Sequence, residues 1–189
     1  MELIYSIKYW EDYYKSGDAP LEPSQFALFC RGFMNEGQSL LDVGAGNLRD
    51  SYYFNSEGLF VTAMDVIDTL TNTGMIYIQG NLAEQKDMFG LVKTFDFVYM
   101  RFLLHALPLE IEKYVLRESY KILNRRGLLC IETRSDKGVL PDNHYRRLIN
   151  MEDLLLRLSD FQLIYKVEQR GLAVRGDENP IIIRVICQR

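Results

Sequence analysis

The feature that most constrains the fold is a short apolar strand pattern that runs directly into two closely spaced glycines. It occupies residues 39–50, whose sequence is SLLDVGAGNLRD. Gly44 allows the chain to turn sharply after the strand, and Gly46 lets the backbone approach a ligand because no Cβ stands in the way. Asp42 adds a carboxylate that is costly to bury without a partner. The stretch therefore predicts a ligand-binding corner of an α/β sheet, with a plain strand–turn–helix corner as the alternative.

Two classes of ligand use a glycine turn at this place in an α/β sheet. Dinucleotide-binding proteins have the pattern G-x-G-x-x-G, in which the pyrophosphate lies on the helix N-terminus and the third glycine permits close helix packing. Here Arg49 stands in place of the third glycine, and Asp42 would repel a pyrophosphate. The sulfonium cofactor S-adenosylmethionine has no phosphate and carries an α-amino group that a carboxylate can receive. The stretch favours S-adenosylmethionine, and a dinucleotide stays open as the alternative.

The run LDVGAG resembles the first motif of class I S-adenosylmethionine-dependent methyltransferases, and NLRDS after it resembles a bacterial subgroup whose motif continues GNGRDS. The resemblance extends over almost the whole chain through Arg101-Phe-x-x-His105-Ala, Glu132-x-Arg134-Ser135, His144-Tyr-Arg-Arg147 and Asp177-Glu-Asn-Pro180-Ile-x-Ile-Arg184. Together these segments resemble small methyltransferases encoded with bacterial capsule, surface-glycan or secondary-metabolite genes. The resemblance implies one α/β domain over residues 1–189, with a Rossmann-like seven-stranded sheet, strand seven antiparallel, flanked by helices.

Length and composition fit one globular domain, since 189 residues that are 48% apolar can bury a full core. The net charge of −4, with both signs interspersed, argues against nucleic acid or an anionic membrane as a partner. We expect no signal peptide, because the start of the chain lacks a basic region, and no membrane span, because no apolar run approaches 18 residues. Cys30, Cys130 and Cys187 form no metal-ligand pattern and indicate reduced core thiols in a cytoplasmic protein.

The first 36 residues predict two helices. Tyr5, Tyr9 and Tyr13 recur at helical spacing, and a second helix is expected between Pro23 and Asn35. One interpretation is an amphipathic helix that simply packs on the domain. The other is a lid in which Trp10 and Tyr14 close over cofactor and substrate, and related methyltransferases with a similar Y-W-x-x-Y-Y segment support it.

Polar residues also follow the second and third predicted strands. Asp65 lies 65 − 46 = 19 residues after Gly46, close to the ~20 expected for an acid that binds ribose hydroxyls. Helix capping is the alternative for Asp65. Asn81 stands where class I methyltransferases usually have an acid that receives the adenine amino group, and its side-chain carbonyl can accept the same hydrogen bond. A helix N-cap is the alternative for Asn81.

The corner after the fourth predicted strand, residues 95–100, lies across the switch point of a doubly wound sheet and so faces the transferred methyl. It lacks the Asn-Pro-Pro-Tyr type of motif that holds an exocyclic amine, which argues against nucleobase acceptors. His105 lies on this corner and is predicted to act as a general base, with His144 as the second candidate. A histidine satisfied within the core is the alternative.

The remaining apolar patterns complete the expected sheet. Strands are predicted at 40–43, 59–64, 75–79, 95–100, 128–131, 161–170 and 181–187, and further helices at 109–124 and 151–158. Seven strands that alternate with helices until a final hairpin fit the methyltransferase sheet, in which the last strand inserts antiparallel beside the fifth.

Basic residues gather after the fifth predicted strand. Arg134, Arg146 and Arg147, near Tyr145, would favour an anionic or hydroxyl-rich acceptor, such as a phosphorylated or acidic sugar unit. The alternative is surface salt bridging to nearby acids.

The predicted site combines these residues. The cofactor site is expected to comprise Trp10, Tyr14, Asp42, Gly44, Ala45, Gly46, Asn47, Arg49, Asp50, Asp65, Val66, Asn81, Leu82, Met100 and Arg101, and the acceptor site Tyr14, Arg134, Tyr145, Arg146 and Arg147, without a metal. The sequence predicts methyl transfer from S-adenosylmethionine, which becomes S-adenosylhomocysteine, to an oxygen of a small-molecule or glycan acceptor. A thiol- or tellurite-type methyltransferase and a non-catalytic cofactor-binding partner are the alternatives.

Overall fold

The computed structural model describes residues 2–68, 75–84, 93–139, 147–174 and 178–189. They form a seven-stranded sheet in the order β3-β2-β1-β4-β5-β7-β6. Its strands are β1 (Ser39–Val43), β2 (Phe60–Asp65), β3 (Ile76–Gln79), β4 (Phe95–Arg101), β5 (Leu123–Arg134), β6 (Gln162–Gln169) and β7 (Ile182–Gln188). The pairs from β3 to β5 are parallel, whereas β7 runs antiparallel to both β5 and β6. The predicted single-domain fold, with strand seven antiparallel beside strand five, is confirmed.

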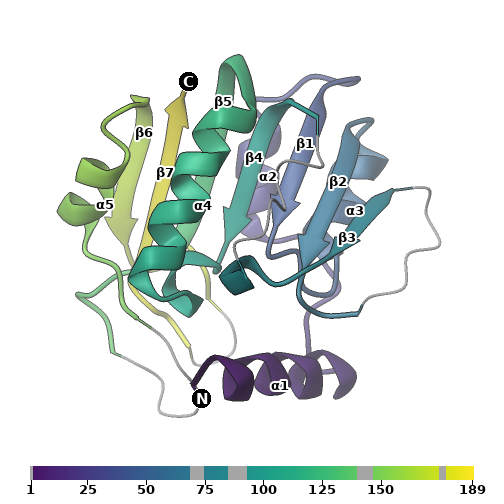
Figure 1. Cartoon of the computed structure of the whole chain (residues 1–189), viewed down its shortest axis with the longest axis vertical. Helices are drawn as coiled ribbons and strands as arrows, with labels where there is room; N and C mark the ends of the chain where they lie inside the picture. The colour runs from purple at the N-terminus through teal and green to yellow at the C-terminus, as the bar shows by residue number, and fades with distance from the viewer. Residues whose placement is uncertain (1, 69–74, 85–92, 140–146, 175–177) are drawn as a thin grey trace.

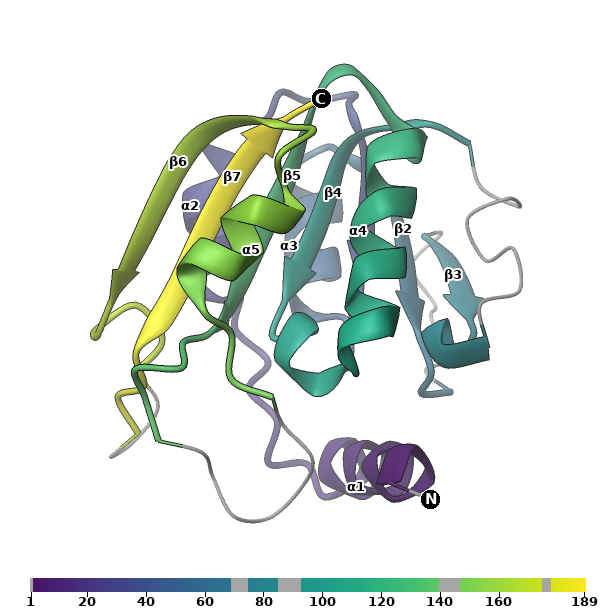
Figure 2. The ribbon, with the colours of Figure 1, turned by 60° about the vertical axis from the view of Figure 1, so that its left-hand side comes forward.

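Helices cover both faces of the sheet, because strands that are buried on both sides need an apolar layer on each. On one face, α2 (Gln25–Arg31) and α3 (Arg49–Ser56) enclose a core that includes Phe26 and Phe54. On the other face, α4 (Leu109–Ile122) and α5 (Met151–Arg157) enclose a second core that includes Val115 and Leu154. Figures 1 and 2 show α4 and α5 in front of the sheet and α2 and α3 behind it.

The first helix, α1 (Glu2–Lys15), belongs to neither layer. Figures 1 and 2 show it lying across the end of the sheet at which β1, β2 and β4 terminate. Its aromatic side chains stack at a spacing of four residues: Tyr9 on Tyr13 with ring centroids 6.4 Å apart, and Trp10 on Tyr14 at 6.1 Å. The carboxyl ends of parallel strands are where α/β proteins bind ligands, so α1 lies over the predicted site.

One boundary differs clearly from the sequence prediction. The helix expected to run to Asn124 ends at Ile122, and β5 begins at Leu123, five residues before the predicted strand. Long-range pairing explains the difference, because Leu123 pairs with Phe95 of β4. Local helical periodicity is a weaker signal than backbone pairing with a neighbouring strand.

The three cysteines are buried and unpaired, as predicted. Cys130 and Cys187 lie on the neighbouring strands β5 and β7, but Cys130 pairs with Ile186 and Leu129 pairs with Cys187. Side chains alternate along a strand, so the two thiols point to opposite faces of the sheet. Burial and a hydrogen bond with Cys130 raise the pKa of the Cys30 thiol. These thiols are suited to core packing and poorly suited to nucleophilic chemistry.

Candidate active site

A cavity of about 940 Å³ opens at the carboxyl ends of the parallel strands, beneath α1. It lies at the point where the strand order reverses, between β1 and β4, which is the usual ligand position in doubly wound sheets. Its size falls in the upper range for small-molecule sites, so it has room for a cofactor together with a small acceptor. The described lining includes these predicted residues: Trp10, Tyr14, Asp42, Gly44, Ala45, Asn47, Arg49, Asp50, Asp65, Val66, Asn81, Leu82, Arg101 and Arg134.

The glycine turn forms the floor of the cavity. Gly44 and Gly46 have φ angles of +83° and +55°, which residues other than glycine rarely adopt. A Cβ at Gly44 would lie 3.0 Å from the side chain of Leu103, and one at Gly46 would overlap the ring and hydroxyl of Tyr14. Gly46 is not itself part of the described lining, because Tyr14 of α1 covers it. The two glycines are therefore needed for both the turn and the close approach of neighbouring groups.

Asp42 is buried on the cavity side of β1, where its carboxylate accepts a hydrogen bond from Ser51 Oγ at 2.6 Å. Burial raises the pKa of Asp42 to about 8, further helped by the negative charges of Asp50 and Asp65 and opposed by the Ser51 bond. A carboxyl group in this state changes charge near neutral pH. A cationic group brought beside it would favour the ionised form.

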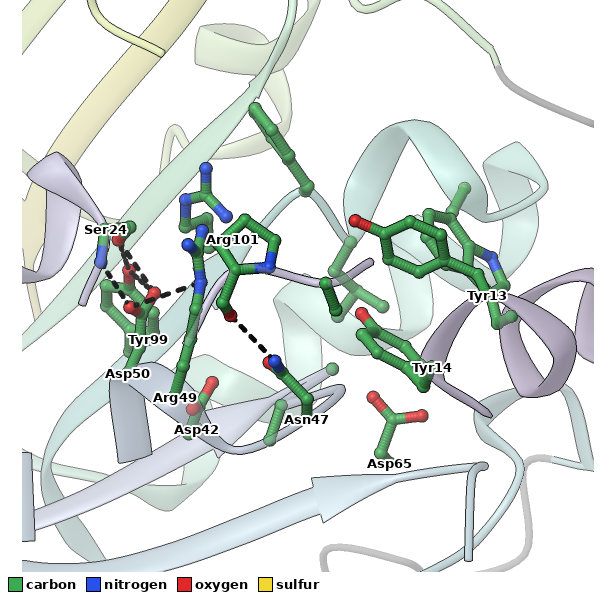
Figure 3. A pocket seen from close by; sticks show the side chains of 18 of the residues that line it. Tyr13, Tyr14, Ser24, Asp42, Asn47, Arg49, Asp50, Asp65, Tyr99 and Arg101 are labelled. Carbon is green, nitrogen blue, oxygen red and sulfur yellow. Dashed lines mark hydrogen bonds and ion pairs between the residues drawn. The ribbon is translucent and has the colours of Figure 1, made fainter. Parts of the chain in front are cut away.

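Asp65, at the end of β2, holds the glycine turn in place. One carboxylate oxygen accepts from Gly46 N at 2.7 Å and the other from Ile67 N at 3.1 Å. Burial raises the pKa of Asp65, and the backbone hydrogen bonds oppose that rise. Figure 3 shows Tyr14 above Asp65. A carboxylate offers about four acceptor positions, so both oxygens keep capacity for a ligand hydroxyl.

Two arginines lie beside Asp42. Figure 3 shows Arg49 and Arg101 close together on the side of the cavity away from Tyr14. Burial and the charge of Arg101 lower the pKa of Arg49. Arg49 Nη1 donates to Glu22 O at 3.1 Å, and Arg101 Nε donates to Glu132 Oε1 at 2.9 Å. Clustered guanidiniums of this kind attract a carboxylate.

Asp50 already has several partners. Its oxygens accept from Ser24 N at 2.7 Å, Ser24 Oγ at 2.8 Å and Tyr99 Oη at 2.8 Å. Ser24 also caps α2 by accepting from Ala27 N. The predicted cofactor residue Asp50 lines the cavity, and the hydrogen bonds tie the starts of α2 and α3 to β4.

The predicted adenine side contains Asn81 together with Val66 and Leu82, all in the lining. Asn81 Oδ1 accepts from Ala83 N at 2.9 Å, so the capping alternative for Asn81 is realised at the start of the 3-10 turn Leu82–Glu84. Asn81 nevertheless belongs to the cavity lining. Met100 is fully buried, and the described lining does not include it.

The opposite side of the cavity contains Arg134, the last residue of β5. Its Nη2 donates to Glu178 Oε2 at 3.0 Å. The Phe102 ring lies 4.3 Å from the guanidinium carbon of Arg101 and 5.7 Å from that of Arg134. Phe102 has a φ of +57°, which is unusual for a bulky residue. Such strain is found at functional sites, where neighbouring structure holds it in place.

His105 lies below the cavity wall and is 1% exposed. Its Nδ1 lies 3.1 Å from Thr133 Oγ1 and accepts from Arg134 N at 3.4 Å. Because a backbone N–H can only donate, this geometry places the Nδ1 lone pair toward the protein backbone. The described lining does not include His105. His105 is therefore buried beside Thr133 and Arg134, and its role as base stays a prediction.

The side chain of Arg147 lies outside the described lining of the cavity. Its guanidinium pairs with Glu112, a fully buried residue of α4 that also pairs with Arg157 at 2.7 Å. This salt bridge is made with a buried acid, whereas the alternative expected surface salt bridges to the nearby acids Glu132, Asp136 and Asp142. The other predicted residues of this segment, His144, Tyr145 and Arg146, lie outside the described residues.

Several residues that line the cavity were not predicted from the sequence. Among them are Ser24, Tyr99, Phe102, Leu172 and Glu178. Ser24 and Tyr99 are remote from the glycine motif in sequence and meet Asp50 only through the fold. Phe102 carried a usable signal, because it adjoins Arg101 at the end of a predicted strand.

Two features are absent from the part of the chain that the structure describes. Within the ranges given above, no helix is both long enough and apolar enough to cross a membrane. The same ranges contain no group of three or more histidine, cysteine or acidic residues placed to hold a metal ion.

The order of the strands and the antiparallel β7 match the fold of solved S-adenosylmethionine-dependent methyltransferases. Three solved structures illustrate the likeness. The 1,6-didemethyltoxoflavin-N1-methyltransferase of Burkholderia thailandensis, solved with 1,6-didemethyltoxoflavin and S-adenosylhomocysteine bound, gives a TM-score of 0.76 at 18% identity over 98% of this chain and 87% of that one. TehB from Haemophilus influenzae gives a TM-score of 0.75 at 16% identity, over 95% of this chain and 67% of that one.

The third structure is the N-methyltransferase NodS from Bradyrhizobium japonicum, in complex with S-adenosylhomocysteine. It gives a TM-score of 0.72 at 14% identity over 100% of this chain and 99% of that one. The sequence matches no protein-family model and no curated protein sequence. At these identities the comparisons define the fold that the chain shares with the three proteins.

Proposed function

We propose that the protein is a methyltransferase that uses S-adenosylmethionine to methylate a small molecule. The observation that carries the proposal is one cavity that combines a buried acid, two arginines and a second acid around a glycine turn. The charges and hydrogen-bonding groups of these residues are complementary to the ionic groups and the hydroxyls of the cofactor. S-Adenosylmethionine supplies an already activated methyl group, so the protein needs chiefly to align the acceptor with it.

The residues fit the cofactor in a definite order along the cavity. Asp42 would receive the α-amino group, and Arg49 and Arg101 would hold the carboxylate. Asp65 would accept the ribose hydroxyls. Beyond Asp65, Asn81 and its neighbours would contact the adenine. Two of the three similar structures hold S-adenosylhomocysteine, which supports the choice of cofactor.

Calorimetry with S-adenosylhomocysteine and with NAD(H) tests the cofactor. The proposal expects heat from S-adenosylhomocysteine at millimolar concentration or below and none from NAD(H). Binding of NAD(H) without binding of S-adenosylhomocysteine would overturn it. Measuring formation of S-adenosylhomocysteine from S-adenosylmethionine over an acceptor panel then separates an enzyme from a non-catalytic cofactor-binding partner.

Cofactor affinity should depend on pH through Asp42. Below the pKa of about 8, the Asp42 carboxyl is mostly protonated in the free protein. Because the cationic amino group requires the carboxylate, binding releases a proton and should strengthen as pH rises, by up to about tenfold per pH unit below pH 8. Titrations between pH 6 and pH 8.5 measure this slope. Asp42→Asn, which cannot ionise, is the matched variant and should flatten it; an equal slope in both proteins would assign the effect to another group.

The finer proposal is an oxygen acceptor, such as a hydroxyl of a sugar, sugar phosphate or other unit of surface-glycan (polysaccharide) or secondary-metabolite biosynthesis. Its support is the basic acceptor side at Arg134 and the sequence resemblance. The similar structures include N-methyltransferases, so the acceptor panel should contain amines and thiols beside alcohols and acids. The proposal places the reaction in the cytoplasm, where the three unpaired thiols would stay reduced.

His105→Gln distinguishes a base from an orienting residue. Glutamine retains bulk and hydrogen bonding but cannot take a proton, so loss of a base would lower turnover by ~10²–10⁴-fold. From the geometry of His105 we expect turnover within about threefold of wild type, with the cofactor's dissociation constant unchanged. Single-turnover rates on the true acceptor measure the difference, and His144→Gln is the companion variant. A large loss confined to His105→Gln would restore His105 as the base.

A further inference from the structure

Arg134 is a buried cation on the acceptor side of the cavity. It is 9% exposed and ends β5, where the cavity lining includes it. Its Nη2 donates to Glu178, and its Nε has no hydrogen-bond partner among the residues that the structure describes. A guanidinium carries five N–H donors, so a single hydrogen-bond partner among the described residues leaves this cation incompletely paired. A buried cation in that state attracts an anion.

Glu178 is a weakly held counter-ion. Its side chain is 57% exposed and makes one ion pair, at 3.0 Å, with Arg134. Exposed ion pairs contribute little free energy, because water solvates the carboxylate nearly as well. Arg134 is buried and needs an anion, whereas Glu178 can return to water. An incoming carboxylate can therefore replace Glu178 without a change in net charge at Arg134.

The other cations of the cavity have different partners. Arg101 pairs with Glu132, and Arg49 lies beside Asp42 in the part of the cavity that the proposed function gives to the cofactor. Arg134 ends β5, the strand beyond β4 in the sheet, so it lies further along the sheet from β1 and β2 than Arg101, which ends β4. It is thus the cation placed to meet the acceptor.

The surroundings of Arg134 define the rest of the ligand. Phe102, Leu103 and Leu107 line the cavity from the corner after β4, and Leu172 and Val174 line it from the loop before β7. Of these residues, Phe102 adjoins the Arg134 guanidinium, whose carbon lies 5.7 Å from the ring centre. An aromatic ring beside a cation that pairs with one carboxylate suits an apolar body with one negative charge. A phosphate monoester carries about −1.5 to −2, more charge than this one arginine neutralises, so the inference keeps the proposed cofactor site but replaces the sugar or sugar phosphate proposed above with an apolar acid.

We propose that the methyl acceptor is an apolar monocarboxylic acid whose carboxylate displaces Glu178 from Arg134. The inference rests on the proposed function, in which the cavity also holds the cofactor. Glu178 occupies the carboxylate position in the empty protein and so competes with the acceptor. The apolar body then lies against Phe102, and the arginine fork orients it so that a hydroxyl on that body meets the methyl group. The new O–CH3 bond forms as the S–CH3 bond breaks, S-adenosylhomocysteine leaves, and the hydroxyl proton passes to water.

The test uses three probe pairs: cinnamate, 4-hydroxybenzoate and hexanoate, each against its primary amide. Dissociation constants are measured with the full chain saturated with S-adenosylhomocysteine. The expected result is that at least one acid binds tenfold or more tightly than its amide. Equal binding of acid and amide in all three pairs would overturn the inference.

Variants identify the residues. Arg134→Met should remove the preference for the acid, and Glu178→Gln should strengthen acid binding several-fold by removing the competing carboxylate. Arg117→Gln and Glu110→Gln, two exposed residues of α4, are charge-matched controls and should change neither value. If Arg134→Met fails to fold, Arg134→Lys keeps the charge without the fork and should retain only part of the preference. A Glu178→Gln variant with wild-type or weaker acid binding would contradict the exchange.

The cofactor titration keeps the two proposals apart. S-Adenosylhomocysteine should bind all of these variants as it binds the wild type. If it binds and no acid is preferred, the proposed function stands and the inference fails. If it does not bind, the proposed function fails, and the acid–amide comparison on the free protein still decides whether Arg134 holds a carboxylate.

Discussion

Replacement of Glu132 by glutamine should destabilise the protein more than any other single change considered for this chain. Glu132 is 1% exposed on β5, and each of its oxygens meets one arginine: Arg101 Nε at 2.9 Å and Arg184 Nε at 2.7 Å. Glutamine has nearly the same shape but no charge, so the guanidiniums of Arg101 and Arg184 would both lose the carboxylate that neutralises them. Removing one partner of a buried ion pair costs about 3–5 kcal/mol.

Arg184 makes the loss more severe, because it is itself buried. Its guanidinium carbon lies 5.2 Å from the Phe26 ring centre, and its Nη2 donates to Leu172 O at 2.8 Å. It has little access to water that could replace Glu132. Arg101 is more exposed and faces the cavity, so it can be solvated there. Most of the cost should therefore come from Arg184.

Thermal and denaturant unfolding measure the effect. A loss of 3–5 kcal/mol corresponds to a fall of roughly 6–20 °C in Tm for a domain of this size. Glu110→Gln, which removes an exposed carboxylate paired with Lys113, is the control and should change stability by less than ~0.5 kcal/mol. The double variant Glu132→Gln with Arg184→Gln should recover part of the loss. A Glu132→Gln protein as stable as wild type would show that the ion pairs contribute nothing net.

The sheet could be predicted from the sequence because its signals are local. Apolar runs of strand length end in an acid or a glycine at the ends of β1 and β2, and these positions also identified Asp42 and Asp65. The β5 boundary could not be predicted in this way, since Leu123 becomes a strand residue only by pairing with Phe95. Local pattern and long-range pairing compete there, and the pairing decides.

The acceptor side was harder to predict for the same reason. Arg134 and Arg147 both look like basic residues after strand five. The fold separates them, because Arg147 meets the buried Glu112 of α4 whereas Arg134 meets the exposed Glu178. Neither acid adjoins its arginine in sequence, so spacing gives no means of ranking the two. His105 likewise looked accessible until Thr133 and Arg134 were placed around its ring.

Replacement of Asp65 by alanine should have the largest effect on cofactor binding. The Asp65 carboxylate holds Gly46 N and Ile67 N and keeps acceptor capacity for the two ribose hydroxyls. Loss of charge-assisted hydrogen bonds of this kind costs roughly 1.5–3 kcal/mol. The dissociation constant for S-adenosylhomocysteine should therefore rise roughly 10- to 150-fold. Asp68→Ala, an exposed acid three residues later, is the matched control and should leave it unchanged.

A ligand comparison separates direct contact with the ribose from an indirect effect on the glycine turn. Wild-type protein should bind S-adenosylhomocysteine more tightly than its 2′,3′-dideoxy analogue, because the analogue offers no hydroxyls to Asp65. In Asp65→Ala the two ligands should bind about equally, since the acceptor of those hydrogen bonds is gone. If the variant weakens both ligands by the same factor and keeps the wild-type difference between them, Asp65 acts only through Gly46 and Ile67, and the ribose hydroxyls bind elsewhere.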